Sequence, residues 1–124
     1  MIKGLGTDIV AIERIEDSYK RLAERFSQRI LTQQELQELS LSSQPERYLA
    51  KHFCVKEACA KALGTGIGRG VSWQHMQIEH DQYGKPLLIL TAGALQRMLD
   101  LSAQQVHVSL SDEKKYVVAT VILE

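Results

Sequence analysis

The chain has 124 residues, 44% of them hydrophobic, and its 15 basic side chains are balanced by 15 acidic ones. One domain of ordinary composition is therefore expected over residues 1–124, and the composition argues against disorder. Zero net charge provides no bulk attraction to nucleic acid or to an anionic membrane, and no apolar run reaches the roughly 20 residues that span a bilayer.

The N-terminal segment and the cysteines indicate the compartment. Asp8 follows the first residues too soon for a signal peptide. Cys54 and Cys59 would lie about 140° apart around a shared helix, so they are poorly placed to bridge each other. Two cysteines alone also make a poor zinc site. Reduced thiols in a cytoplasmic protein are the simplest interpretation.

The N-terminal part of the sequence predicts a strand followed by helices. Gly4–Ile12 is a short apolar strand that contains Asp8. The stretch from Ile9 to Arg29 has helical periodicity, because apolar residues recur at intervals of three and four. These residues are Ile12, Ile15, Tyr19, Leu22 and Phe26. The sequence Thr32-Gln33-Gln34-Glu35 is a capping-box pattern, which begins a further helix.

The clearest predicted element is a helix over Glu46–Leu63, with capping residues before it and Gly64 as a left-handed C-terminal cap after it. The rest of the chain predicts four strands and one short helix. Their ranges are Val71–His80 and Leu87–Leu90 joined by the turn 81–86, the helix Ala92–Leu101, and the hairpin strands Val106–Leu110 and Tyr116–Leu123. Helices mixed with neighbouring strands, without β-α-β alternation, indicate an α+β fold.

Glu57 is the most informative candidate residue. It lies four residues after Phe53 and three before Ala60, so it continues the apolar stripe of the predicted helix. A carboxylate on such a face is costly unless it is paired or bound to a metal. The spacing alone favours a pair with a lysine or arginine from elsewhere, or a stripe edge that reaches water.

Asp8 is the second candidate, because it is the only charged residue between Lys3 and Glu13. One interpretation makes it the N-cap of a helix that begins immediately after it. The other pairs it with Glu57, since two carboxylates from different elements can share a hard cation such as Mg²⁺. Water and phosphate oxygens would then complete the coordination.

Lys61 lies one turn after Glu57 on nearly the same face. It is placed either to neutralise a phosphate or to form an i,i+4 ion pair with Glu57. The glycine-rich run from Gly64 to Gly70 lacks the ending of a Walker A loop and follows a helix rather than a strand. Its glycines are expected to permit tight turns or the close approach of a ligand to the backbone.

Two further patterns have both a functional and a structural interpretation. Arginines spaced by seven, four and four residues form one basic stripe beside Phe26, namely Arg14, Arg21, Arg25 and Arg29. The stripe either docks an acidic partner or, by default, is a solvated face balanced by nearby carboxylates. His107, Ser109 and Ser111 share one face of the last hairpin, and without a nucleophile elbow a solvated strand face is predicted.

Several segments of the chain share an order and spacing that chance does not readily produce. The most specific is Phe53–Ile67, which contains Lys56-Glu57-Ala58, Lys61-Ala62 and Gly64-Thr65-Gly66. The others are Gly4–Val10, Arg25-Phe26 with Arg29–Thr32, Gly84-Lys85-Pro86 and His107-Val108-Ser109. Over nearly the whole chain they resemble the holo-[acyl-carrier-protein] synthases, the small bacterial 4'-phosphopantetheinyl transferases.

The resemblance implies a reaction and a set of residues for it. The family moves 4'-phosphopantetheine from coenzyme A to a serine of apo acyl carrier protein in fatty-acid biosynthesis, and releases adenosine 3',5'-bisphosphate. Asp8 and Glu57 match its magnesium ligands, and Lys61 would steady the negative charge at the attacked phosphorus. The carrier serine is the nucleophile, and its proton passes either to Glu57 or to a water on the metal.

The resemblance also implies the ligand contacts and the assembly. Gly64, Gly84, Lys85 and Pro86 match segments that line the coenzyme A nucleotide. The arginine stripe, which is Arg14, Arg21, Arg25 and Arg29 with Phe26, falls where the family docks the acidic recognition helix of the carrier. The family fold is α+β, with a long helix packed on an antiparallel sheet, in a homotrimer whose active sites lie between subunits.

Two positions depart from the family pattern. His52 stands where many members have arginine, and Asp112 stands where many have histidine, so contacts with the nucleotide at these points are expected to differ. Two other classes of function remain as alternatives. A non-catalytic module that binds coenzyme A or the carrier would not need Asp8, Glu57 and Lys61 together, and a nucleic-acid-binding domain fits poorly with zero net charge.

Overall fold

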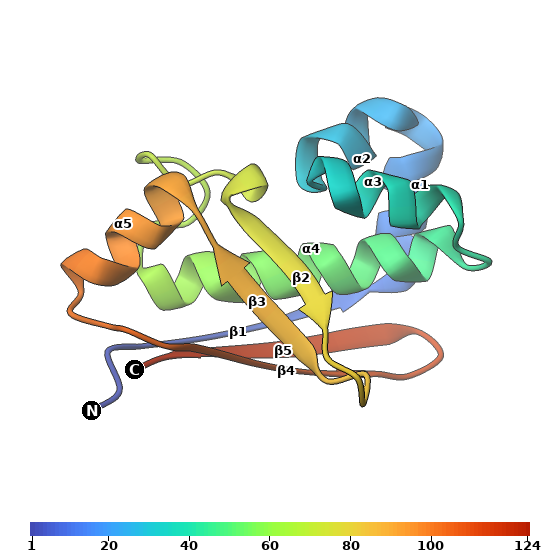
Figure 1. Cartoon of the computed structure of the whole chain (residues 1–124). Helices are drawn as coiled ribbons and strands as arrows, with labels where there is room; N and C mark the ends of the chain where they lie inside the picture. Colours follow the sequence, from blue (N-terminus) through green and yellow to red (C-terminus); the bar gives the residue numbers. More distant parts are fainter.

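Two antiparallel sheets organise the chain (Figure 1). This computed structural model describes residues 1–124. A three-stranded sheet has the order β1 (Gly4–Ala11), β5 (Tyr116–Leu123), β4 (Val106–Asp112). The strands β2 (Met76–His80) and β3 (Pro86–Leu90) form a separate two-stranded hairpin. The predicted α+β class is confirmed, and so are both predicted hairpins.

The longest helix, α4 (Pro45–Leu63), runs along one face of the three-stranded sheet (Figure 1). Glycines allow this close contact, because a Cβ atom on Gly6 would overlap the carbonyl oxygen of Ala58, and one on Gly4 that of Ala62. The backbones of β1 and α4 therefore touch directly. Gly64 closes the helix with φ 77°, the left-handed cap that its position predicts.

The predicted helix through Arg29 is in fact two helices, α1 (Ile12–Leu22) and α2 (Glu24–Ile30). They meet at Ala23, whose φ of 51° and ψ of −131° are far from helical values. Residues 9–11 stay extended because they pair with β5. The break turns α2 away from the line of α1, so the arginine stripe does not lie on one continuous helix.

The other helices are α3 (Gln33–Ser40) and α5 (Ala92–Asp100). Thr32 and Glu35 form the predicted capping box at the start of α3. The predicted strand Val71–His80 begins only at Met76, because Ser72 caps a short 3-10 turn, η1 (Trp73–His75), in front of it. None of the helices is both long enough and apolar enough to cross a bilayer.

The two faces of the three-stranded sheet differ in character. The inner face, against α4, buries Val10, Val117, Ala119 and Val121 together with the free thiols Cys54 and Cys59. The outer face has no helix or strand drawn against it (Figure 1). It leaves apolar side chains in solvent, with exposed fractions of 63% for Leu5, 61% for Ile9, 51% for Tyr116 and 39% for Val118.

Candidate functional site

Asp8 and Lys61 meet where β1 crosses α4. The Nζ atom of Lys61 donates to Oδ1 of Asp8 and to the carbonyl oxygen of Thr7, both at 3.0 Å. The helix α1 that follows has Ala11 as its N-cap, with no side-chain capping bond, so the interpretation of Asp8 as an N-cap is wrong. The i,i+4 pair between Lys61 and Glu57 is also replaced, because Lys61 pairs with Asp8 instead.

Glu57 is half-buried on α4, at the edge of the apolar stripe, and it forms no ion pair. Burial and the nearby Asp8 carboxylate raise the pKa of Glu57, while Lys61 and Arg14 oppose the increase. The two carboxylates are thus close enough to repel each other. The ammonium of Lys61 forms an ion pair with Asp8 and also acts on Glu57.

This donor set fits a hard divalent cation. Two carboxylates from different elements, Asp8 on β1 and Glu57 on α4, lie near enough to act on each other. The chain provides no group of three or more His, Cys, Asp or Glu side chains that could enclose a metal by themselves. Mg²⁺ commonly takes one or two carboxylates and fills its other positions with water and phosphate oxygens. Asp8 and Glu57 are therefore the residues that would hold such an ion.

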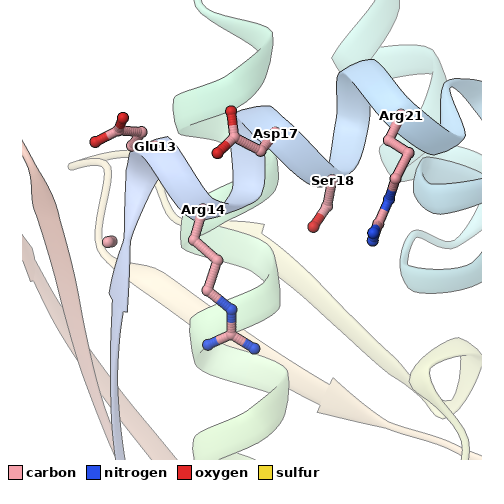
Figure 2. Close-up of a pocket in the computed structure, with 6 residues that line it drawn as sticks. Glu13, Arg14, Asp17, Ser18 and Arg21 are labelled. Carbon is pink, nitrogen blue, oxygen red and sulfur yellow. The ribbon is translucent and has the colours of Figure 1, made fainter.

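The helix α1 has a basic face that carries Arg14 and Arg21 (Figure 2). Arg14, Ser18 and Arg21 point to one side of the helix, whereas Glu13 and Asp17 point to the other. The surface pocket around them has a volume of about 520 Å³. Arg14 is near enough to act on Glu57, so this face adjoins the two carboxylates.

The rest of the stripe borders a second pocket, of about 400 Å³, between α1, α2, α4 and η1. We call it the aromatic–arginine pocket. Its lining includes Arg21, Arg25, Phe26, Arg29, Phe53 and Trp73. The ring centroids of Phe26 and Phe53 are 6.4 Å apart, and those of Phe53 and Trp73 are 5.4 Å apart. The arginine stripe therefore borders a pocket that is lined by three neighbouring aromatic rings.

Trp73 was not predicted to be a site residue, and Phe53 was noted only in the apolar stripe and at the start of the Phe53–Ile67 motif. Nothing in the spacing connects residue 73 with residues 26 and 53, because η1 comes from a different part of the chain. The partial exposure of all three rings is the signal that distinguishes them from core residues, and it is visible only in the folded chain.

The expected nucleotide-binding residues do not form one group within the chain. Gly64 borders a pocket of about 450 Å³ with Thr65, Arg69 and Arg97 beside α5. Gly84 and Lys85 lie in the turn between β2 and β3, and Pro86 is the first residue of β3 (Figure 1). Asp81 Oδ1 holds that turn by accepting hydrogen bonds from the backbone N–H groups of Tyr83 and Lys85. Within one chain, Gly64 and the turn 84–86 therefore lie apart and do not share a pocket.

The two positions that depart from the family pattern have partners inside the chain. His52 is only 4% exposed, and its Nδ1 atom lies 2.9 Å from the carbonyl oxygen of Tyr48. Asp112 pairs with Arg47 at 2.7 Å and with Lys51 at 3.7 Å. The burial of His52 keeps its ring away from the surface, in line with the expectation that the contact made by arginine in many members differs here.

The hairpin face of His107, Ser109 and Ser111 is exposed, as predicted. His107 Nε2 lies 3.0 Å from the carboxylate of Glu124, and neither serine forms a hydrogen bond with it. The face carries no Ser-His nucleophile arrangement.

Comparison with known proteins places these features in a family. A sequence model of the 4'-phosphopantetheinyl transferase superfamily matches residues 4–121. The chain belongs to this superfamily. It is 54% identical to the holo-[acyl-carrier-protein] synthase of Shewanella frigidimarina, over 99% of this chain and 98% of that protein. The resemblance stated from the sequence is confirmed.

Solved structures of the family have the same fold. The holo-[acyl-carrier-protein] synthase of Neisseria meningitidis superimposes with a TM-score of 0.94 at 42% identity, over 100% of this chain and 99% of that one. The Helicobacter pylori enzyme, crystallised in complex with coenzyme A, gives a TM-score of 0.83 at 32% identity, over 97% and 99% of the two chains.

Proposed function

We propose that this protein is a magnesium-dependent holo-[acyl-carrier-protein] synthase of the cytoplasm. It transfers 4'-phosphopantetheine from coenzyme A to a serine of apo acyl carrier protein for fatty-acid biosynthesis, and releases adenosine 3',5'-bisphosphate. Similarity over the full length of named synthases supports the reaction. The observation that supports the site is the meeting of Asp8, Glu57 and Lys61 where β1 crosses α4.

Each residue of this site has a distinct task in the proposed reaction. Asp8 and Glu57 hold Mg²⁺, which supplies positive charge to the diphosphate of coenzyme A. Lys61 carries donors on a flexible stem, and they reach the phosphoryl oxygens where negative charge grows during transfer. The proton of the carrier serine would pass either to Glu57 or to a water on the metal.

The carrier is proposed to dock along the arginine stripe of α1 and α2. Exposed Arg14, Arg21, Arg25 and Arg29 offer positive charge to an acidic helix, and Phe26 lies beside them in the aromatic–arginine pocket. Apolar side chains of the carrier helix would enter the pocket while its carboxylates meet the arginines at the rim. This arrangement would bring the carrier serine toward Glu57, because Arg14, at one end of the stripe, acts on the Glu57 carboxylate.

We propose further that the active protein is a homotrimer with sites between subunits. The outer face of the three-stranded sheet carries Leu5, Ile9, Tyr116 and Val118 in solvent, and apolar patches of this kind mark contacts between proteins. The separation of Gly64 from the turn 84–86 supports the same proposal, because a second subunit can bring that turn to the first subunit's site.

The deciding experiment is intact-mass spectrometry of apo acyl carrier protein after incubation with this protein, coenzyme A and Mg²⁺. A gain of one phosphopantetheine, abolished by EDTA and restored by added Mg²⁺, is expected. Carrier that stays in the apo form, with both proteins folded, would contradict the proposal. Binding of coenzyme A or carrier without transfer would then favour a non-catalytic binding module.

A further inference from the structure

Lys56, the residue before Glu57, is completely buried. Its Nζ atom donates to the carbonyl oxygen of Ile30 at 2.7 Å, to Oε1 of Glu35 at 2.6 Å and to the carbonyl oxygen of Trp73 at 3.3 Å. An ammonium has three protons, and each of these has an acceptor here. Burial lowers the pKa of Lys56, and the Glu35 carboxylate opposes that decrease.

Glu35, the partner of Lys56, is completely buried as well. Its Oε1 atom also accepts from the backbone N–H of Thr32 at 2.9 Å, as part of the capping box of α3. Its Oε2 atom accepts from the backbone N–H of Ile78 on β2 at 2.8 Å. The pair therefore fastens α4 to the end of α2, the start of α3, η1 and β2.

Both carbonyl groups that accept from Lys56 belong to residues of the aromatic–arginine pocket. Ile30 and Trp73 both line that pocket, and Phe53, one helical turn before Lys56, lines it as well. On the same helix, the next residue is Glu57. One buried ammonium thus connects the walls of the proposed carrier-docking pocket to the turn of α4 that carries the proposed metal ligand.

A buried ion pair gives little net stability compared with apolar side chains of similar size, because desolvation offsets the attraction. What Lys56 and Glu35 provide is a set of directional bonds to backbone groups of four different segments. We propose that Lys56 and Glu35 are positioning residues, which set the aromatic–arginine pocket at a fixed distance from Asp8 and Glu57. This inference rests on the proposed docking of the carrier at that pocket.

The test is the double variant Lys56→Met with Glu35→Gln. Lys56→Met alone would leave the Glu35 carboxylate buried without its partner and is expected to unfold the protein. The glutamine at position 35 removes that charge and keeps one oxygen, which can accept from one of the two backbone N–H groups, that of Thr32 or that of Ile78. The carbonyl oxygens of Ile30 and Trp73 lose their donor, so the pocket walls are no longer tied to α4.

We expect the folded double variant to bind apo carrier about tenfold more weakly and to show a similar rise in the KM for carrier, as for the loss of an interaction near 1.4 kcal/mol. The KM for coenzyme A should change by no more than about twofold, because the double variant leaves the proposed coenzyme A contacts in place. A general loosening of the structure would raise both KM values. Direct carrier binding is measured by calorimetry, so this result does not depend on turnover.

Two control variants separate this inference from the docking proposal. Lys51→Met removes a lysine from the same helix at a partly exposed position, and carrier binding should not change. Arg25→Glu reverses a charge at the pocket rim and should weaken carrier binding. If Arg25→Glu weakens binding and the double variant does not, the positioning role is refuted alone. If neither variant weakens binding, the docking proposal and the positioning role are both refuted.

Discussion

The Nε2 atom of His52 lies 3.6 Å from Oε2 of Glu35, inside the protein and without a hydrogen-bond partner. The other ring nitrogen, Nδ1, faces the carbonyl oxygen of Tyr48 and must carry a proton to bond with it. In the neutral ring, a lone pair on Nε2 therefore points toward a carboxylate. His52 is surrounded by Glu35, Lys56 and Glu38, with Tyr48 stacked on its ring.

This arrangement predicts a loss of stability in mild acid. Burial lowers the pKa of His52, although Glu35 opposes the decrease. The unfolded chain takes up a proton on this histidine below a pH of about 6.5, before the folded chain does. Protonation of His52 in the unfolded chain therefore does not affect stability above that pH. Below it, the free energy of unfolding falls as the pH drops toward the pKa of His52 in the folded protein.

The measurement is urea unfolding of the parent protein and of His52→Gln at pH 8 and pH 5. The parent should lose more stability between the two values than the variant, because glutamine does not titrate. Equal losses in the two proteins would show that the proton is taken up elsewhere.

Glu57→Gln is expected to separate stability from activity. The amide removes the repulsion between Glu57 and Asp8, so the melting temperature should stay the same or rise. Transfer to the carrier should fall about 100-fold or more, since a neutral amide binds a divalent cation poorly. Calorimetry and the mass-spectrometric assay measure the two quantities. Near-normal transfer would refute the assignment of Glu57 as a metal ligand.

Ala23→Gly should stabilise the protein. The φ of 51° and ψ of −131° at Ala23 lie in a region that glycine enters at little steric cost. The relief of strain should exceed the entropic cost of glycine, with a net gain of about 1 kcal/mol in the free energy of unfolding. Ala94→Gly, inside α5, is the control and should be destabilising. A loss of stability in Ala23→Gly would contradict the strained joint between α1 and α2.

Val118→Lys tests the proposed trimer. Val118 lies on the central strand of the three-stranded sheet, on its outer face, with 39% of its surface exposed. A lysine there should dissociate the assembly into monomers in analytical ultracentrifugation, because it would bury a charge between subunits. Leu41→Lys, directly after α3 at a position that is 87% exposed, should leave the assembly intact. Trimers that survive Val118→Lys would place the interface elsewhere.

Local patterns in the sequence were enough to predict most elements of the fold. The long helix, its glycine cap, the capping box at Thr32 and the two hairpins depend on neighbours within a few residues. The break at Ala23 was not predictable in this way, since alanine favours helices and the segment around it contains no glycine or proline. Tertiary packing of α2 overrides the local preference.

In the candidate site too, single residues could be predicted from the sequence, whereas their contacts with residues far along the chain could not. Asp8, Glu57 and Lys61 stood out because their charges interrupt apolar surroundings or follow a family motif. The pairing of Lys61 with Asp8, 53 residues apart, depends on the crossing of β1 over α4. Lys56 was missed as a buried residue because a lysine within a helix normally reaches water, and its partner Glu35 is 21 residues away.

The direct backbone contact between β1 and α4 also bears on how the sequence can change. Gly4 and Gly6 rest against carbonyl groups of α4, so the position of Asp8 relative to that helix depends on main-chain atoms rather than on the packing of side chains. Substitutions elsewhere in the core can therefore accumulate without moving Asp8 along α4. The two glycines themselves are the positions where even one added methyl group would separate the proposed metal ligands.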